Sequence, residues 1–238
     1  MFNYFSLLIL NFFDYLHKKK ILKFFKKKKK ILYFKTFFDV GAHKGESIEF
    51  FLQNFAIQTI YSFEASKDNY KKCVNNINSK NYKNTKIFIE NLALGENSKT
   101  KFLLETSESS SSTINKINKK SKYYKKKNYF LNLKNEKKTR ITQIKLSDYI
   151  KKHKITSFEL IKIDTEGYEY FVLLGAEKFL KKFKYILFEH HYDDMIQKKY
   201  KFSDINSLLK DNGFKQELKL KMPFRKTFEY IYFNKNTI

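Results

Sequence analysis

Residues 37–47 have the sequence FFDVGAHKGES, and this stretch decides the fold. Aromatic and β-branched residues lead into Asp39, glycines follow at Gly41 and Gly45, and a helix-compatible segment begins at Glu46. A strand that turns on glycines into a helix lets the backbone approach a small ligand closely. We therefore expect a ligand site at this turn.

Strand-like and helix-like segments alternate on both sides of the turn. The apolar patterns predict strands at residues 35–40, 59–64, 86–90, 100–104, 140–145, 158–164, 184–190 and 228–233. Helices are expected at residues 46–54, 67–78, 147–152 and 202–212, and a further helix with a break at Gly175 runs to about Lys182. Ser66 is the expected N-cap of the second helix, and Gly213 ends the one at 202–212. This alternation predicts a mostly parallel sheet with helices on both faces.

The chain divides into an arm and one domain. Residues 1–34 form a basic and apolar N-terminal arm, and residues 35–238 form a single α/β domain. Within the domain, residues from about 106 to 138 are rich in Ser, Lys, Asn and Tyr and have no clear period. We expect them to be a basic excursion on the surface.

The net charge is +25, from 49 Lys and Arg against 24 Asp and Glu. Such a charge attracts nucleic acid or anionic lipid non-specifically. Lysine far outnumbers arginine, whereas an evolved nucleic-acid surface usually uses arginine for bidentate contacts, so we attribute most of the charge to background composition. The single cysteine, Cys73, cannot form an internal disulfide and predicts a reducing, cytoplasmic location.

The arm contains two unlike segments. Residues 4–13 are apolar but too short to span a bilayer, and they lack the features of a secretory signal. Residues 17–35 contain ten lysines and no acid. One interpretation is peripheral contact with an anionic membrane. The other, which we favour, is a helical arm packed on the domain with its lysines in water.

The acids at the predicted strand ends indicate the ligand. Glu64 lies nineteen residues after Gly45, the spacing at which an acid accepts hydrogen bonds from ribose hydroxyls. The turn lacks the G-x-G-x-x-G spacing of a dinucleotide site, and no P-loop occurs. Five of the predicted strands carry an acid at or next to their end: Asp39, Glu64, Glu90, Asp164 and Glu189. Carboxylates gathered at one crevice repel a pyrophosphate but suit a sulfonium and an ammonium, which predicts S-adenosylmethionine.

Seven segments occur in an order similar to that of the FkbM-type S-adenosylmethionine-dependent methyltransferases, over about residues 37–190. They are FFDVGAHKGES, YSFEAS, NLALGE, SSTIN, TQIKLSDYI, LIKIDTEGYEYFVLLGAEKFL and ILFEH. The resemblance implies a class I (Rossmann-like) methyltransferase fold, with a seven-stranded sheet whose last strand is antiparallel. It also implies O-methyl transfer, usually to a sugar or polyketide hydroxyl.

The same resemblance implies roles for individual cofactor-binding residues. Asp39, Gly41 and Gly45 would shape the methionine end of the site, and Glu64 would hold the ribose. The segment from Asn91 to Ala93 would lie beside the adenine. His43 stands where the family commonly has Asn, so the backbone cradle is expected there without a defined role for this side chain.

Methyl transfer to an alcohol also requires removal of the hydroxyl proton. The segment KIDTEG places Asp164 and Glu166 at a strand end, while Glu189 and His190 end the next strand and His191 follows. We expect one of these acids or histidines to be the general base. Alternatively, Asp164 contacts only the ammonium of the cofactor, and Glu166 caps the following helix. Adjacent histidines point apart on a strand, so no metal site is expected.

The function predicted from the sequence is therefore O-methyl transfer from S-adenosylmethionine to a hydroxyl of a glycan or related small metabolite. Two alternatives stay open: an NAD-dependent oxidoreductase on a Rossmann sheet, and a basic module that binds RNA or a membrane. Specific nucleic-acid partners are not expected. Amino-directed base methylation uses a [DN]-P-P-[YF] element, and the only proline, Pro223, lies far from the strand at 158–164.

Overall fold

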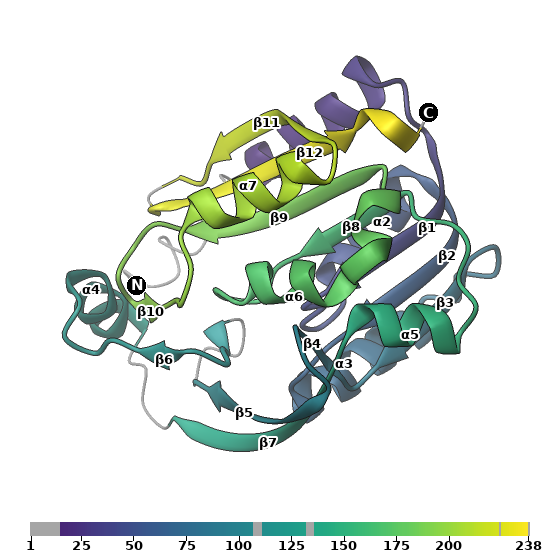
Figure 1. Cartoon of the computed structure of the whole chain (residues 1–238). Helices are drawn as coiled ribbons and strands as arrows, with labels where there is room; N and C mark the ends of the chain where they lie inside the picture. The colour runs from purple at the N-terminus through teal and green to yellow at the C-terminus, as the bar shows by residue number, and fades with distance from the viewer. Residues whose placement is uncertain (1–14, 107–110, 132–135, 224, 238) are drawn as a thin grey trace.

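Seven strands form the central sheet, in the order β11-β12-β9-β8-β1-β2-β3 (Figure 1). The computed structural model describes residues 15–106, 111–131, 136–223 and 225–237. β12 is antiparallel to both of its neighbours, and the other neighbouring pairs are parallel. The fold class predicted from the sequence, a mostly parallel class I sheet with an antiparallel last strand, is confirmed. The strands are β1 (Tyr33–Val40), β2 (Ala56–Phe63), β3 (Lys86–Glu90), β8 (Leu160–Ile163), β9 (Tyr185–His191), β11 (Phe214–Lys221) and β12 (Thr227–Asn234).

Helices cover both faces of this sheet. On one face, drawn in front in Figure 1, lie α5 (Leu146–Lys152), α6 (Glu169–Ala176) with η3 (Glu177–Lys182), and α7 (Phe202–Asp211). On the other lie α2 (Glu46–Asn54), α3 (Lys67–Asn78) and the π-helical segment η1 (Lys23–Lys28). Phe37 and Phe38 of β1 point to opposite faces, so each anchors a different hydrophobic core.

Several predicted boundaries are confirmed in detail. Ser66 is the N-cap of α3, and its side chain accepts a hydrogen bond from the backbone N–H of Asn69. Gly213 follows α7 with φ +87°, a conformation that favours glycine at a helix end. The helix that begins at Glu169 changes to a 3₁₀ segment just after Gly175. An added Cβ at Gly175 would lie 2.1 Å from the carbonyl oxygen of Gly95, so close packing requires this glycine.

The excursion at residues 106–138 contains short elements that the sequence did not predict. The segment contains β6 (Lys116–Ile117), which pairs with β10 (Ile196–Gln197), and α4 (Lys122–Leu131). Beside it, β5 (Lys99–Glu105) and β4 (Ala93–Leu94) flank β7 (Lys137–Ile144) in a three-stranded sheet. β6 has only two residues and a partner far along the chain, so no local pattern could reveal it. The last element is η4 (Lys235–Thr237).

The described part of the arm belongs to the domain. Residues 15–22 are helical and continue into η1. Ile21, Phe24 and Phe25 are buried in the same core as Phe37, so the predicted boundary after residue 34 does not separate a structural unit. The described part of the arm therefore packs on the domain with the lysines at 18–20, 27 and 28 exposed, and contact of these lysines with an anionic membrane stays a prediction. Residues 4–13 lie outside the described part, in which no helix has the length and apolarity needed to cross a membrane.

Candidate active site

The glycine turn after β1 is held close to the end of β8. Gly41 has φ +86°, and a Cβ added there would lie 1.9 Å from the carbonyl oxygen of Asp164. Gly45 has φ +95° and precedes α2 as its N-cap. Both glycines adopt backbone conformations that side chains disfavour, so the turn forms a cradle of bare backbone. The carboxyl ends of β1 and β8, where the cradle lies, are the usual ligand position in such a sheet.

Glu64, directly after β2, is tied to this turn. Its Oε2 accepts a hydrogen bond from the backbone N–H of His43 at 2.7 Å, and its Oε1 accepts one from the backbone N–H of Ser66 at 2.8 Å. Each carboxylate oxygen keeps a second lone pair for a ribose hydroxyl. The side chain is 7% exposed, and burial raises the pKa of Glu64 to about 7. The position and chemistry of Glu64 fit a nucleoside ligand.

The His43 side chain turns away from Glu64 and towards the start of α2. His43 has φ +51°, and its Nδ1 lies 3.0 Å from Oε1 of Glu46. The other oxygen of Glu46 accepts a hydrogen bond from the backbone N–H of Lys44 at 3.0 Å. Burial opposes ionisation of Glu46, but the contacts with His43 and the backbone outweigh it and lower its pKa to about 2. Thus the His43 backbone binds Glu64, while the His43 side chain stabilises the turn through Glu46.

Asp39 and Lys162 lie side by side next to the turn. They are register partners on β1 and β8, and Asp39 is fully buried. Oδ2 of Asp39 accepts a hydrogen bond from Oγ of Ser47 at 2.5 Å, and Nζ of Lys162 donates to Oδ2 of Asp164 at 3.0 Å. Burial raises the pKa of Asp39, and the charge of Lys162 opposes that shift. For Asp164, the effect of Lys162 outweighs burial and lowers its pKa.

This arrangement corrects the prediction of five acids around one open crevice. Asp39 is enclosed and lies against a lysine, and Glu90 accepts a hydrogen bond from the Tyr149 hydroxyl at 3.0 Å on the α5 side of the sheet. Three of the five, Glu64, Asp164 and Glu189, remain at the cradle edge. Lys162 was missed, although a charged residue inside the apolar strand LIKI was a visible signal.

The segment predicted to lie by the adenine, residues 91–93, contacts the backbone at Glu64. Nδ2 of Asn91 donates to the carbonyl oxygens of Glu64 and Ala65, at 2.9 and 3.2 Å. Ala93 is buried in β4. These contacts put the segment next to the ribose acid, and the contact with adenine stays a prediction.

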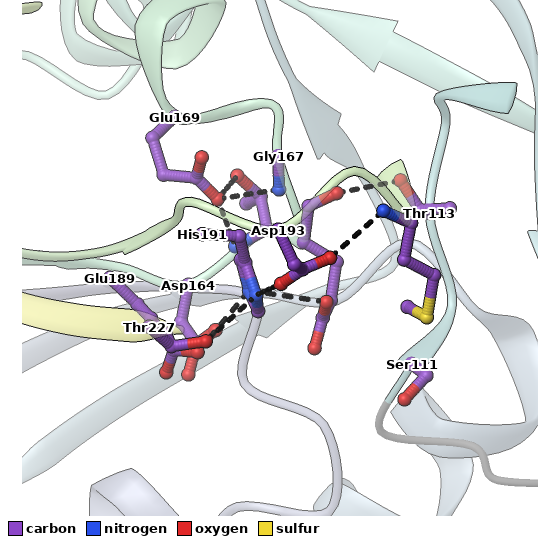
Figure 2. Close-up of polar contacts among 12 residues, drawn as sticks. Ser111, Thr113, Asp164, Gly167, Glu169, Glu189, His191, Asp193 and Thr227 are labelled. Atoms are coloured by element: carbon purple, nitrogen blue, oxygen red, sulfur yellow. Dashed lines mark hydrogen bonds and ion pairs between the residues drawn. The ribbon is translucent and has the colours of Figure 1, made fainter. Parts of the chain in front are cut away.

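A second group of ionisable residues gathers where β8 and β9 end (Figure 2). Nε2 of His191 lies 3.2 Å from Oε1 of Glu189 and 3.3 Å from Oε2 of Glu166, while Nδ1 lies 3.1 Å from Oγ1 of Thr227. Burial, which leaves His191 8% exposed, opposes its charge, but the neighbouring carboxylates outweigh burial and raise its pKa to about 10. His191 is therefore an imidazolium at neutral pH.

His190 points to the opposite face of β9, as the alternation of a strand predicts. It is 2% exposed, and its ring lies against Tyr192 and Phe202, with centroids 4.8 and 5.5 Å away. Burial, assisted by the charge of Lys198, lowers the pKa of His190 to about 3. Of the acids and histidines named as possible bases, Asp164, Glu166, Glu189 and His191 lie together, and His190 does not join them.

Glu169 organises the turn that carries Glu166, and the sequence analysis missed it. Oε1 of Glu169 accepts hydrogen bonds from the backbone N–H groups of Thr165 and Gly167, at 3.1 and 2.9 Å (Figure 2). Oε2 accepts one from the Tyr200 hydroxyl at 2.5 Å. Glu166 does not cap α6 in this structure, because the N-cap position is Tyr168 and no side chain caps it by a hydrogen bond. Glu166, at φ +50°, instead directs its carboxylate to His191.

Comparison with known proteins agrees with this geometry. The family model described as "Methyltransferase FkbM domain" matches residues 39–215, well over half of the chain. The fold is similar to a crystal structure of methyltransferase FkbM from Methylobacillus flagellatus KT, with 16% identity and a TM-score of 0.57. That match covers 89% of this chain, which spans about half (47%) of the length of that protein.

A second similar structure is magnesium protoporphyrin IX methyltransferase (ChlM) from Synechocystis PCC 6803 with bound SAH. The identity is 8%, the TM-score is 0.51, and the match covers 94% of this chain and 84% of that one. At these identities the likeness concerns the fold alone. No curated protein matches the sequence significantly.

Proposed function

Because this chain belongs to the methyltransferase FkbM family, we propose that it transfers a methyl group to a hydroxyl oxygen of a glycan or related small metabolite. The family match confirms the enzyme class and the S-adenosylmethionine cofactor predicted from the sequence. It favours methyl transfer over the oxidoreductase alternative. The hydroxyl acceptor is the proposed part.

The chain's own residues fit the cofactor. The positive-φ glycines Gly41 and Gly45 form the turn at which the methionine end would lie, and Glu64 offers free lone pairs to the ribose. Asp164, whose lowered pKa keeps it ionised, is placed to attract the ammonium of the cofactor. When bound, S-adenosylmethionine supplies an electrophilic methyl group on a sulfonium.

Glu166 is the general base in this proposal. His191 is already protonated at neutral pH, and His190 is enclosed by aromatic rings on the other face. Burial raises the pKa of Glu166, which brings it towards the range in which a carboxylate accepts a proton efficiently. Burial and the charge of Asp164 raise the pKa of Glu189 well above its ordinary value, so Glu189 holds its own proton more firmly.

Glu166 would accept the proton of the acceptor hydroxyl, and S-adenosylmethionine, when bound, would supply the methyl group that takes the place of this proton. The products are a methyl ether, S-adenosylhomocysteine and a protonated Glu166. The His191 imidazolium holds the Glu166 carboxylate in place through their 3.3 Å ion pair. Most of the rate enhancement in such a displacement comes from positioning the two reacting atoms.

The excursion at residues 111–131 forms the acceptor side of the site. Oγ1 of Thr113 donates to the carbonyl oxygen of Glu166, and Nδ2 of Asn115 donates to that of Gly167, both at 2.7 Å. The pairing of β6 with β10 joins this segment to the loop after His191. Both segments that flank Glu166 are thus outside the central sheet, where acceptor specificity can vary without disturbing the cofactor cradle.

The observation that carries the proposal is the meeting of Glu166, Glu189 and Asp164 at one edge of the cradle. The test is mass spectrometry of candidate glycans incubated with S-adenosylmethionine and either the native chain or Glu166→Gln. We expect a methyl increment with the native chain and a loss of at least about a hundredfold in rate for Glu166→Gln, with unchanged affinity for S-adenosylhomocysteine. Retained turnover in Glu166→Gln would remove Glu166 as the base.

We also propose that the arm touches anionic membrane surfaces peripherally. The support is the set of exposed lysines on residues 15–30, next to Tyr15, which is 54% exposed. The cytoplasmic location stays a prediction.

A further inference from the structure

A groove of about 1000 Å³ lies at the edge of the sheet opposite the cofactor cradle. It is formed where strands β8, β9 and β11 begin and where the antiparallel β12 ends, close to the C-terminus in Figure 1. Its volume is at the upper end of the range typical of small-molecule sites. Because the cradle lies at the carboxyl ends of the parallel strands, the sheet separates the two sites.

The groove is lined mainly by cations. Five lysines surround it, against two acids, Glu159 and Asp211; the lysines are Lys35, Lys181, Lys182, Lys184 and Lys210. They come from three separate parts of the chain that only the fold brings together. Thr156, Ser157 and Asn236 add hydroxyl and amide groups to the same lining.

The charges of these lysines are not balanced locally. Across the described ranges, no ion pair joins any of the five ammonium groups to a carboxylate, although lysines elsewhere do pair, such as Lys80 with Glu49 at 2.6 Å. Lys182 lies over the rings of Phe158 and Phe179. One of the two acids is already engaged, because Glu159 accepts a hydrogen bond from the backbone N–H of Lys35.

Like charges around one concave surface repel one another, and the low-dielectric wall strengthens their field. An anion in the groove would relieve that repulsion at several lysines at once, and hydroxyl and amide donors would complete its hydrogen bonds. Lysine ammonium groups bind phosphate as point charges without a fixed geometry. We propose that this groove is a second binding site, for a soluble ligand that carries several phosphate groups.

Inorganic tripolyphosphate is the probe for this site, and its binding to the full chain can be measured by calorimetry at low ionic strength. The test variant is Lys181→Gln/Lys184→Gln/Lys210→Gln, which spares Lys182 because of its packing on the two rings. The control variant is Lys67→Gln/Lys71→Gln/Lys72→Gln, which removes the same charge from exposed positions of α3. Binding of S-adenosylhomocysteine to both variants shows whether each has folded.

We expect tripolyphosphate to bind the native chain and the control similarly, and the groove variant about tenfold more weakly. Orthophosphate should bind much more weakly than tripolyphosphate. The proposal is overturned if tripolyphosphate does not bind, if both variants lose affinity equally, or if only anionic vesicles and no soluble phosphate compound bind through these lysines. None of these results depends on methyl transfer, so the proposed function is tested separately.

Discussion

The backbone N–H of His43 donates a hydrogen bond to Oε2 of Glu64 over 2.7 Å, and this contact joins the glycine turn after β1 to the acid after β2. The turn and the ribose acid are therefore one unit. A change in the protonation of Glu64 or in the backbone of the turn should alter cofactor affinity, which leads to the first two predictions.

The affinity for S-adenosylhomocysteine should depend on pH through Glu64. Its pKa is raised to about 7, so the carboxyl is largely protonated below pH 7, whereas ribose hydroxyls donate to the ionised form. We expect the dissociation constant to fall by up to about tenfold per pH unit as the pH rises towards 7, and to level off above it. Calorimetric titrations at values from about pH 5.5 to about pH 8.5 measure this change in the dissociation constant. Glu64→Gln should bind weakly with little pH dependence. If the affinity of the native chain does not change with pH, Glu64 does not hold the ribose as an ionised carboxylate.

Alanine at Gly41 should be far more damaging than alanine at Gly45. Both positions have positive φ, so each substitution costs about 1 kcal/mol of backbone strain. At Gly41 the new Cβ would also meet the Asp164 carbonyl at 1.9 Å, whereas at Gly45 its nearest neighbours are side-chain atoms of Ile77 and Cys73, at 3.2 and 3.3 Å. We expect Gly41→Ala to lose S-adenosylhomocysteine binding and Gly45→Ala to retain most of it. Thermal unfolding of both variants distinguishes lost binding from lost folding. Equal affinities would show that the β1–β8 approach does not shape the cradle.

His191 should make stability depend on pH in the alkaline range. Its pKa rises from 6.5 to about 10 on folding, so its ion pairs contribute fully below pH 6.5 and are lost as the pH rises through 10. We expect His191→Gln to lower the free energy of unfolding by about 3 kcal/mol near pH 6, with a smaller difference near pH 10. Urea unfolding of the native chain and the variant gives these values. The matched control is the exposed His153→Gln, for which we expect little change. A difference that is constant with pH would mean that His191 is not charged in the folded chain.

Replacing the five lysines at residues 26–30 with glutamine should weaken binding to anionic vesicles. Each basic residue near an anionic surface contributes about 1 kcal/mol to binding. The affinity for the vesicles should therefore fall by more than about a hundredfold when all five are replaced. Cofactor affinity should not change, because these residues lie in and after η1 and far from the cradle. Co-sedimentation with vesicles measures the first and calorimetry the second. The control replaces five exposed lysines elsewhere, at positions 67, 71, 72, 151 and 152. If the control loses as much affinity for the vesicles, the net charge of the protein explains the binding and the arm has no special part in it.

Much of the site was predictable because its chemistry is local in sequence. Gly41, Gly45 and Glu64 follow strands whose apolar patterns are clear, and the ends of parallel strands meet at one edge of a sheet. Glu166 and Glu189 were predicted for the same reason. His191 was named among the possible bases, but its protonated state could not be predicted, because its charge depends on carboxylates that only the fold brings to it. Glu169 was missed because a glutamate at the start of a helix gives no sign of whether it faces water or the backbone.

The amino-acid sequence alone determined the order of strands and helices, the glycine turn and the acid that follows β2, since these depend on periodicity and on backbone preferences of single residues. Only the tertiary structure decided which charges have a partner. Lys162 lies beside Asp39 and pairs with Asp164, whereas the lysines of the groove remain without ion pairs among the described residues. It also revealed β11, whose lysine-rich pattern suits an exposed edge strand, and the β6–β10 pair. The reason is physical: the energy of a charge or of a short strand depends on partners that are distant in the chain, and no local pattern contains them.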